Sequence, residues 1–158
     1  MRKTDAGSQG ARTLSVETSA ARSAVMRAVK ARDTKPERTV RRLAHALGYR
    51  FRLHRKDLPG TPDLVFPTRK KVVFVHGCFW HGHDCARGAR TPKANADYWR
   101  AKVERNRARD ARAVDDLAAL GWEALVLWEC ALKDADAVAC LLRGFLGAPG
   151  AARDSSKP

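Results

Sequence analysis

The ten-residue run His76–Cys85 constrains this chain more than any other part of its sequence. It concentrates three histidines, two cysteines and two adjacent aromatic side chains, and it has neither helical nor strand periodicity. Within it, Cys78, His83 and Cys85 form a C-x4-H-x-C pattern. Three such ligands need a fourth to complete a tetrahedral Zn²⁺ site. Cys130 lies just past a predicted strand, next to Glu129, and that strand could bring its thiolate to the run, so we expect these four residues to form a structural zinc site.

Each of these assignments has an alternative. His76 and His81 could supply the imidazole ligand in place of His83, which has the tightest spacing to the second cysteine of the run. Cys130 could be a small buried apolar residue, and we expect that of Cys140, on the apolar side of a predicted C-terminal helix. Disulfides are not expected, because disulfide frameworks belong to secreted chains and the first twenty residues contain no apolar segment.

The net charge of +14 is large for 158 residues, and it is unevenly distributed. Residues 1–60 carry +10 and residues 61–113 carry +7, whereas residues 114–158 carry −3. The natural partner of such a chain is a polyanion, most commonly nucleic acid. Arg outnumbers Lys by 21 to 10, which suits bidentate phosphate contact, although a GC-rich genome would produce the same bias.

The apolar composition favours a folded protein outside the membrane. Hydrophobic residues make up 44% of the chain, enough for a buried core. Aliphatic and aromatic runs such as Val72–Val75 are far shorter than the ~20 apolar residues of a membrane span. We therefore expect a soluble, cytoplasmic protein with no membrane partner.

Periodicity predicts one α/β domain over residues 15–147, between disordered tails at residues 1–14 and 148–158. The predicted helices cover residues 15–30, 34–47, 95–120 and 134–146, and the predicted strands cover residues 49–54, 63–66, 71–76 and 122–128. The second helix begins with a capping box from Thr34 to Glu37, and Asn95 is expected to cap the third. The segment 77–93 is an unusually long loop for a compact domain, which favours a functional role.

A carboxylate and two histidines suggest a second metal site near the strand ends. Asp63 follows the rigid turn at Pro62, and the next predicted strand ends at His76. Since Mg²⁺ prefers oxygen ligands, Asp63, a backbone carbonyl of residues 74–76 and phosphate oxygens could hold it. His76 and His81 could then transfer protons near neutral pH.

Other roles are open for the acidic residues. Asp63 could simply cap its turn. Glu37 could orient a histidine or a metal-bound water, or it could act in the capping box alone. Asp110 could pair with a histidine, but on a charged helix we expect it to be solvated.

The aromatic residues provide a third kind of signal. Phe79 and Trp80 are adjacent in a loop, and Trp99 lies at the start of the basic third helix. On a basic surface such side chains could stack on bases or wedge between base pairs. The alternative is packing in the core, which we expect of Trp122 and Trp128.

Four segments together resemble the very-short-patch-repair (Vsr) DNA mismatch endonucleases. They are TKPE from Thr34, LPGTPD from Leu58, FVHGCFWHGHDC from Phe74 and WEC from Trp128, and the resemblance spans about residues 18–146. It implies a fold similar to restriction endonucleases, with a mixed central sheet flanked by helices and a structural zinc loop. It also implies an activity: nicking one strand of duplex DNA on the 5′ side of the thymine in a T·G mismatch, which arises when 5-methylcytosine deaminates.

The same resemblance implies roles for single residues. Asp63 and the backbone carbonyl of Val75 would hold Mg²⁺, His76 and His81 would act around the scissile phosphate, and Glu37 would support the site. The zinc ligands would be Cys78, His83, Cys85 and Cys130, and the side chains intercalating beside the mismatch would be Phe79, Trp80 and Trp99. The implied setting is a monomer in the bacterial cytoplasm, acting on a DNA duplex with a T·G mismatch and meeting mismatch-repair proteins.

One departure concerns the wider nuclease superfamily. Its second motif has an acidic residue and a lysine, whereas this chain has Phe74–His76 there, which leaves the number of Mg²⁺ ions open. Val75 stands where some relatives have Thr, a change that a main-chain ligand tolerates.

Two other functions compete with the endonuclease. A non-catalytic, zinc-stabilised DNA-binding module recognising distorted duplex would explain the charge, the zinc pattern and the aromatic residues. It would not explain why Asp63, His76 and His81 occur together. A zinc hydrolase acting on a small substrate fits poorly, because three cysteine ligands make a closed site.

Overall fold

The computed structural model describes residues 32–150. The chain divides into two units between Asp33 and Thr34, and the second contains every helix and strand of the described residues. The predicted tail at 1–14, the predicted helix at 15–30 and residues 151–158 of the other predicted tail lie outside the described residues.

A mixed three-stranded sheet forms the centre of this unit, as the α/β prediction requires. Strand β2 (Lys71–His76) lies in the middle, antiparallel to β1 (Leu64–Phe66) and parallel to β3 (Glu123–Trp128). The parallel pair is joined through the long loop and helix α3 (Ala96–Ala119), the kind of crossover that parallel strands need. The register sets His76 directly beside Trp128.

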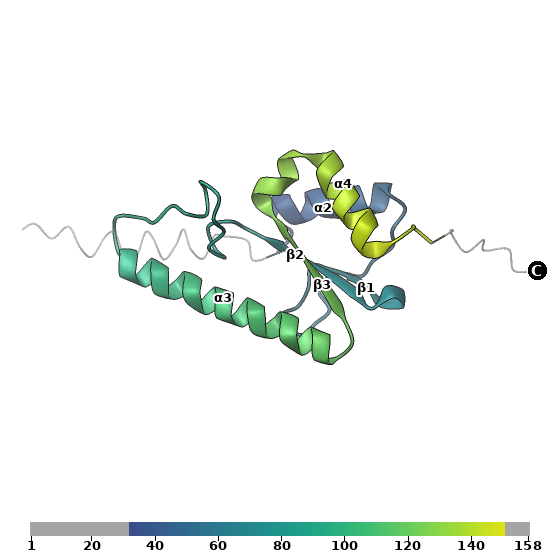
Figure 1. Cartoon of the computed structure of the whole chain (residues 1–158), viewed down its shortest axis with the longest axis horizontal. Helices are drawn as coiled ribbons and strands as arrows, with labels where there is room; N and C mark the ends of the chain where they lie inside the picture. Colours follow the sequence, from purple (N-terminus) through teal and green to yellow (C-terminus); the bar gives the residue numbers. More distant parts are fainter. Residues whose placement is uncertain (1–31, 151–158) are drawn as a thin grey trace, which may run out of the picture. The chain divides into compact units, whose positions relative to one another are not determined.

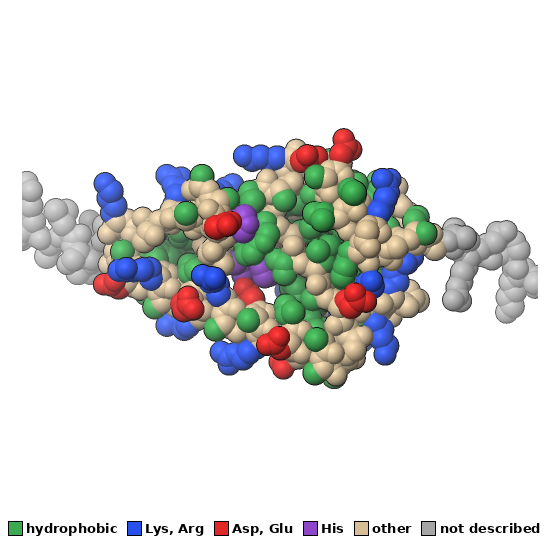
Figure 2. All heavy atoms as spheres, viewed as in Figure 1, with side chains coloured by type: hydrophobic (Ala, Val, Ile, Leu, Met, Phe, Trp, Pro, Cys, Tyr) green, Lys and Arg blue, Asp and Glu red, His purple; other side chains and the backbone are tan. Residues whose placement is uncertain are grey.

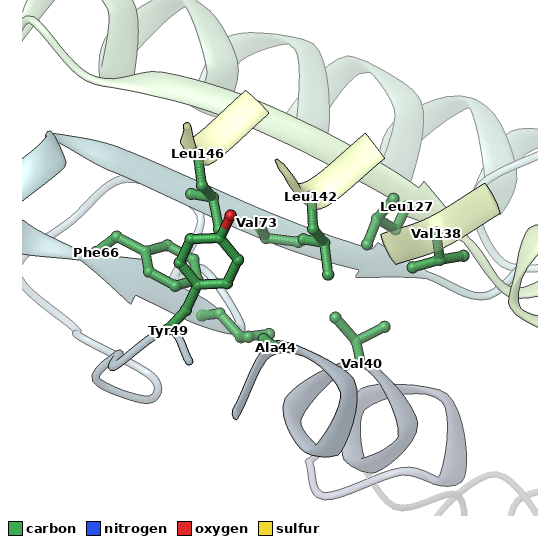
Figure 3. Close-up of a cluster of buried hydrophobic side chains, with 10 residues drawn as sticks. Val40, Ala44, Tyr49, Phe66, Val73, Leu127, Val138, Leu142 and Leu146 are labelled. Carbon is green, nitrogen blue, oxygen red and sulfur yellow. The ribbon is translucent and has the colours of Figure 1, made fainter. Parts of the chain in front are cut away.

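Helices cover both faces of the sheet (Figure 1). Helices α2 (Lys35–Ala46) and α4 (Ala135–Leu146) pack on one face, and α3 covers the other. The first core, which Figure 3 shows, joins α2 and α4 to alternate strand residues and consists of Val40, Ala44, Tyr49, Leu64, Phe66, Val73, Leu127, Val138, Leu142 and Leu146. The second core lies under α3 and consists of Leu58, Val65, Val72, Phe74 and Leu117.

Strand alternation determines where the functional residues lie. Phe74 belongs to the core under α3, so the period of two places His76, at the end of the same strand, on the α3 face as well. Trp128 lies beside it at the end of β3. Two short 3₁₀ helices, Pro67–Arg69 and Glu129–Lys133, follow β1 and β3, and the second carries Cys130.

The predicted capping box at the start of α2 is confirmed. The Thr34 hydroxyl oxygen accepts from the Glu37 backbone N–H at 3.4 Å and donates to the Glu37 carboxylate at 2.7 Å. At the end of α3, Gly121 adopts φ +75, a left-handed conformation that ends a helix without steric cost. Within the described residues, no helix is both long and apolar enough to cross a bilayer.

Three local predictions are wrong. Residues 49–54 form no strand; Arg52 makes one isolated bridge to Val65, because β1 offers only three residues and His54 turns the chain at φ +45. Asn95 precedes α3 in a left-handed conformation (φ +58), and its side chain makes no cap hydrogen bond. Cys140 is exposed, because the buried positions of α4 include Leu142, about 200° around the helix from it.

Candidate functional site

The four predicted zinc ligands come together at one end of the sheet. The ligand atoms of Cys78, His83, Cys85 and Cys130 all lie within 4.8 Å of one another. Cys130 Sγ is 3.6 Å from His83 Nδ1, close to the edge of about 3.5 Å expected for a sulfur and a nitrogen bound to one tetrahedral Zn²⁺. The other ring nitrogen of His83 lies 3.3 Å from a carboxylate oxygen of Asp84, an arrangement typical of histidines that bind metal.

The acidities of two thiols also suit this donor set. Burial raises the pKa of Cys78 to about 11. Hydrogen bonding from His83 lowers the pKa of Cys85 to about 6, and the Gly88 N–H contacts the same sulfur at 3.4 Å. Zn²⁺ binds thiolates, so a cation in this cluster would compensate the charge that burial disfavours on Cys78.

Two glycines that the sequence analysis did not single out hold the loop in place. A Cβ on Gly88 would lie 2.1 Å from the His83 carbonyl oxygen, so no other residue fits where the loop folds back on itself. Gly82 has φ +63, and its Cβ would lie 2.6 Å from a methyl carbon of Val103 on α3. Asn106, also on α3, donates from its side-chain amide to the Trp80 carbonyl at 2.8 Å. The loop is therefore fixed against α3 by backbone proximity as well as by its ligand cluster.

His76 and His81 form a stacked pair near the four predicted zinc ligands. Their ring centroids are 3.9 Å apart and the planes differ by 7°. His81 Nδ1 lies 2.5 Å from Asp110 Oδ2 on α3, so the expectation that Asp110 is solvated is wrong. Burial, and to a smaller extent the neighbouring His81, lowers the pKa of His76 to about 4. The His76 ring is therefore neutral at pH 7.

Trp128 lies between the predicted zinc ligands and the histidine pair. Its ring stacks on His83 at 4.4 Å and meets His76 edge-on at 5.3 Å. The sequence analysis placed Trp128 in the core; in the structure it is half-buried and contacts both clusters. Figure 2 shows histidine side chains, drawn purple, in a hollow of the molecular face that faces the viewer.

Asp63 lies alongside β2, where the antiparallel register continues to Phe74, two residues before His76. Its carboxylate accepts a 2.7 Å hydrogen bond from the Val75 backbone N–H, and its own N–H donates to the Val73 carbonyl at 3.1 Å. Burial, together with the negative charge of Glu37, raises the pKa of Asp63 to about 6 against the opposing effects of the Val75 N–H and Arg41. A half-buried carboxylate with a second acid nearby suits a hard cation.

Glu37 acts in the capping box, and its position near Asp63 also allows the predicted supporting role. It is 5% exposed, it belongs to the capping box, and its charge acts on Asp63. Arg41, one turn along α2, binds the Glu37 carboxylate at 3.0 Å and lies 2.8 Å from His54 Nε2. The analysis of the sequence missed Arg41 and His54; for Arg41, the i,i+4 spacing from Glu37 was an available signal.

The three predicted DNA-contacting aromatic residues form one half-buried group. Phe79 is 5.1 Å from Trp80 and 5.5 Å from Trp99, and the two tryptophan rings are 6.1 Å apart. Lys102 Nζ lies 5.5 Å from each tryptophan ring centroid, a cation–π arrangement. The group joins the loop to the first turns of α3 and is neither fully buried nor fully exposed.

Comparison with known proteins identifies the family. The family model for the DNA mismatch endonuclease Vsr matches residues 14–87. The Vsr endonuclease of Escherichia coli K12 is 41% identical over 118 residues, 75% of each chain. The type II nicking enzyme V.XorIIP of Xanthomonas oryzae pv. oryzae is 57% identical over 122 residues, which cover 77% of this chain and 89% of the relative.

The chain belongs to the Vsr family of DNA mismatch endonucleases.

A third relative, the type II nicking enzyme V.NmeAIP of Neisseria meningitidis, is 42% identical over 117 residues, 74% of this chain and 83% of its own length. The Vsr model's matched range includes Asp63, the two stacked histidines and three of the four clustered zinc-type ligands. Cys130, Asp110 and Trp99 lie beyond it, so for this Vsr-family chain it is the geometry that joins them to the site.

Proposed function

We propose that this protein is a strand-specific endonuclease that nicks duplex DNA on the 5′ side of the thymine in a T·G mismatch produced by deamination of 5-methylcytosine. The observation that carries the proposal is the hydrogen bond between the Asp63 carboxylate and the backbone of Val75, the residue before His76, whose ring stacks on His81. Membership of the Vsr family and relatives named as nicking enzymes support it. A restriction-endonuclease-like fold is part of the same proposal.

Asp63 and the Val75 carbonyl would hold Mg²⁺. The raised pKa of Asp63 supports this assignment, because burial near Glu37 leaves the carboxylate short of positive charge. When bound, Mg²⁺ polarises the scissile phosphate and stabilises negative charge on the leaving oxygen. The side chain of residue 75 would take no part, so the valine at this position is compatible with the role.

The histidines would act as general acid and general base in phosphodiester hydrolysis. The Asp110 carboxylate can only accept a hydrogen bond, so His81 would carry its proton on Nδ1. Its Nε2 would then exchange a proton with water or with the leaving oxygen. Asp110 orients this ring and would stabilise the positive charge that develops on it. His76, neutral at pH 7, would bind beside it around the same phosphate. Glu37 would support the site through its charge near Asp63.

Asp110→Asn should lower kcat for nicking on the order of 10²-fold while the Kd for T·G duplex changes less than threefold, because the variant loses the orienting acceptor and not a DNA contact. Single-turnover kinetics and equilibrium binding separate the two effects. Asp115→Asn, an exposed acid on the same helix, is the matched control and should behave as the parent. Equal losses in kcat and binding would mean that Asp110 has only a structural role.

Zn²⁺ would occupy the cluster of Cys78, His83, Cys85 and Cys130 and would be structural. Four protein ligands close the coordination sphere and leave no position for a substrate, which argues against a zinc hydrolase. The ion would order a loop that contains few aliphatic residues. That loop carries His81 and the aromatic residues, so the zinc site would support both cleavage and recognition.

Phe79, Trp80 and Trp99 would intercalate beside the mismatch, where unstacking costs less than in a paired duplex. The double variant Phe79→Ala with Trp80→Ala should lower the preference for T·G over matched duplex by about tenfold or more. Competition binding on the two duplexes measures the preference directly. If both affinities fall by the same factor, the aromatic group does not sense the mismatch.

A nicking assay tests the function itself. Duplexes with T·G or the matched T·A pair, in several flanking sequences and with a different label on each strand, are incubated with Mg²⁺. We expect a single nick 5′ of the mismatched thymine and none on the other strand. Binding of the mismatch without cleavage in any context would instead favour the non-catalytic DNA-binding module.

We also expect the protein to act as a monomer and to meet mismatch-repair proteins.

A further inference from the structure

One flank of α3 carries a continuous row of positive charge. Lys102, Arg105, Arg109 and Arg112 follow one another at intervals of three, four and three residues, the spacing that keeps side chains on one side of a helix. The three arginines are exposed and Lys102 is half-buried. We call these four residues the basic flank.

The acidic residues of α3 lie mostly elsewhere. Asp97, Glu104 and Asp115 recur at intervals of seven and eleven residues on a different side of the helix. Asp110 points inward to His81. Among the described acidic residues of α3, only Asp116 falls on the basic flank, one turn beyond its C-terminal end.

The basic flank is continuous with the proposed site. It begins at Lys102, whose ammonium lies over Trp80 and Trp99. It then passes the His81–Asp110 pair, where Arg109 Nη2 lies 3.5 Å from the second Asp110 oxygen and its charge reaches His76. The row therefore leads from the aromatic group at Trp80 and Trp99, past the His81–Asp110 pair, and along the helix beyond that pair.

The dimensions of the basic flank match one strand of DNA. From Lys102 to Arg112 the helix rises about 15 Å, at about 1.5 Å per residue. A DNA strand presents one phosphate per ~3.4 Å of axis and winds around that axis between phosphates, so a straight row of this length can meet about two or three successive phosphates. Arginine also suits bidentate phosphate contact.

Without a bound anion, the like charges of the basic flank destabilise α3. Arg105 and Arg109 are four residues apart, Arg109 and Arg112 three apart, and like charges at these spacings destabilise a helix. A polyanion lying along the row would remove this repulsion.

We propose that the basic flank of α3 binds successive phosphates of one strand of the substrate duplex, and so sets the position of the duplex on the site without reading its sequence. This inference rests on the proposed function, because it takes the bound partner to be duplex DNA. A phosphate contact of this kind adds affinity equally to matched and mismatched duplexes.

The salt dependence of DNA binding tests the proposal with a matched pair of double variants. R105Q/R112Q removes two charges from the basic flank and leaves Arg109, beside Asp110, in place. R42Q/R143Q removes two exposed charges from α2 and α4, on the other face of the sheet. Binding of the full-length, zinc-loaded chain to T·G and matched duplexes is measured without Mg²⁺ over a range of salt concentrations.

For R105Q/R112Q we expect the slope of log Kd against log salt to fall by about two, and affinity to fall by the same factor on both duplexes. R42Q/R143Q should keep the parental slope. The melting temperature of R105Q/R112Q without DNA should equal or exceed that of the parent, since repulsion is relieved.

The proposal is overturned if R105Q/R112Q keeps the parental slope, or if R42Q/R143Q loses as much, since net charge alone would then account for the effect. A loss confined to T·G duplex also contradicts it, because it would indicate base reading. These readouts need no cleavage. A parent protein that never nicks T·G duplex would refute the proposed function while the salt slopes still decide the role of the basic flank.

Discussion

Asp63→Asn should reduce the nicking rate by about 10³-fold or more while the Kd for T·G duplex stays within about threefold of the parent. The amide can still accept the Val75 N–H bond, but it cannot supply the charge that holds Mg²⁺, and metal stabilisation of the phosphate contributes several kcal/mol at about 1.4 kcal/mol per tenfold in rate. Single-turnover cleavage of a labelled duplex measures the loss. Asp57→Asn, an exposed acid six residues earlier, is the control and should cleave normally.

The same variant should be more stable than the parent in the absence of Mg²⁺. The pKa of Asp63 is raised in the fold to about 6, so the unfolded chain releases this proton at lower pH than the folded one. Asp63 therefore costs stability progressively as pH rises from about 4 to 6, by roughly 1–3 kcal/mol at pH 7.5. Asp63→Asn should raise the melting temperature at pH 7.5, and this gain should vanish below about pH 4. A variant that is less stable than the parent at pH 7.5 would contradict this account of the carboxylate.

Cys85→Ser should reduce bound zinc to zero and remove both nicking and mismatch binding. Zinc contributes on the order of 10–16 kcal/mol in small finger peptides, and the loop that it would order contains few aliphatic residues. Elemental analysis gives the zinc content, and circular dichroism with limited proteolysis between residues 77 and 94 reports the state of the loop. We expect rapid cleavage in that segment while α2, α4 and the core between them persist.

Cys140→Ser is the matched control for this experiment. It makes the same chemical change at an exposed cysteine of α4, outside the ligand cluster, and should leave zinc content and nicking unchanged. A Cys85→Ser protein that remains folded, active and loaded with zinc would refute the assignment of Cys85 as a ligand.

The ligand cluster was predictable because its signal is local. Cys78, His83 and Cys85 are close in sequence, and only Cys130 had to be brought by a strand. The mixed sheet and its flanking helices also follow from short apolar strands separated by a long helical segment. The predicted strand at 49–54 failed because alternation shows that a segment could pair, and not whether a partner strand is long enough.

The inward position of Asp110 was available from the sequence. Val103, Asn106, Asp110, Ala113 and Leu117 recur at intervals of three, four, three and four residues, which is the inner face of an amphipathic helix. The charged composition of α3 concealed this pattern. Helical spacing alone would therefore have paired Asp110 with the loop that α3 covers.

Other contacts could not be predicted, because they depend on segments distant in sequence. Trp128 meets His76 and His83 through strand register and loop folding, more than forty residues apart in the chain. Arg41 meets His54 where an irregular segment returns to α2. Nothing local marks Gly88 as the residue that touches the His83 backbone.

The central claim is that Asp63 and the Val75 carbonyl hold a divalent cation beside two imidazoles. Crystals of the zinc-loaded protein with a T·G duplex, grown with Mn²⁺ as a substitute for Mg²⁺, test it through anomalous diffraction at the manganese edge. The account predicts a peak within bonding distance of an Asp63 carboxylate oxygen and the Val75 carbonyl oxygen. A manganese peak bound to other residues, or none at Asp63 with the duplex in place, would contradict it.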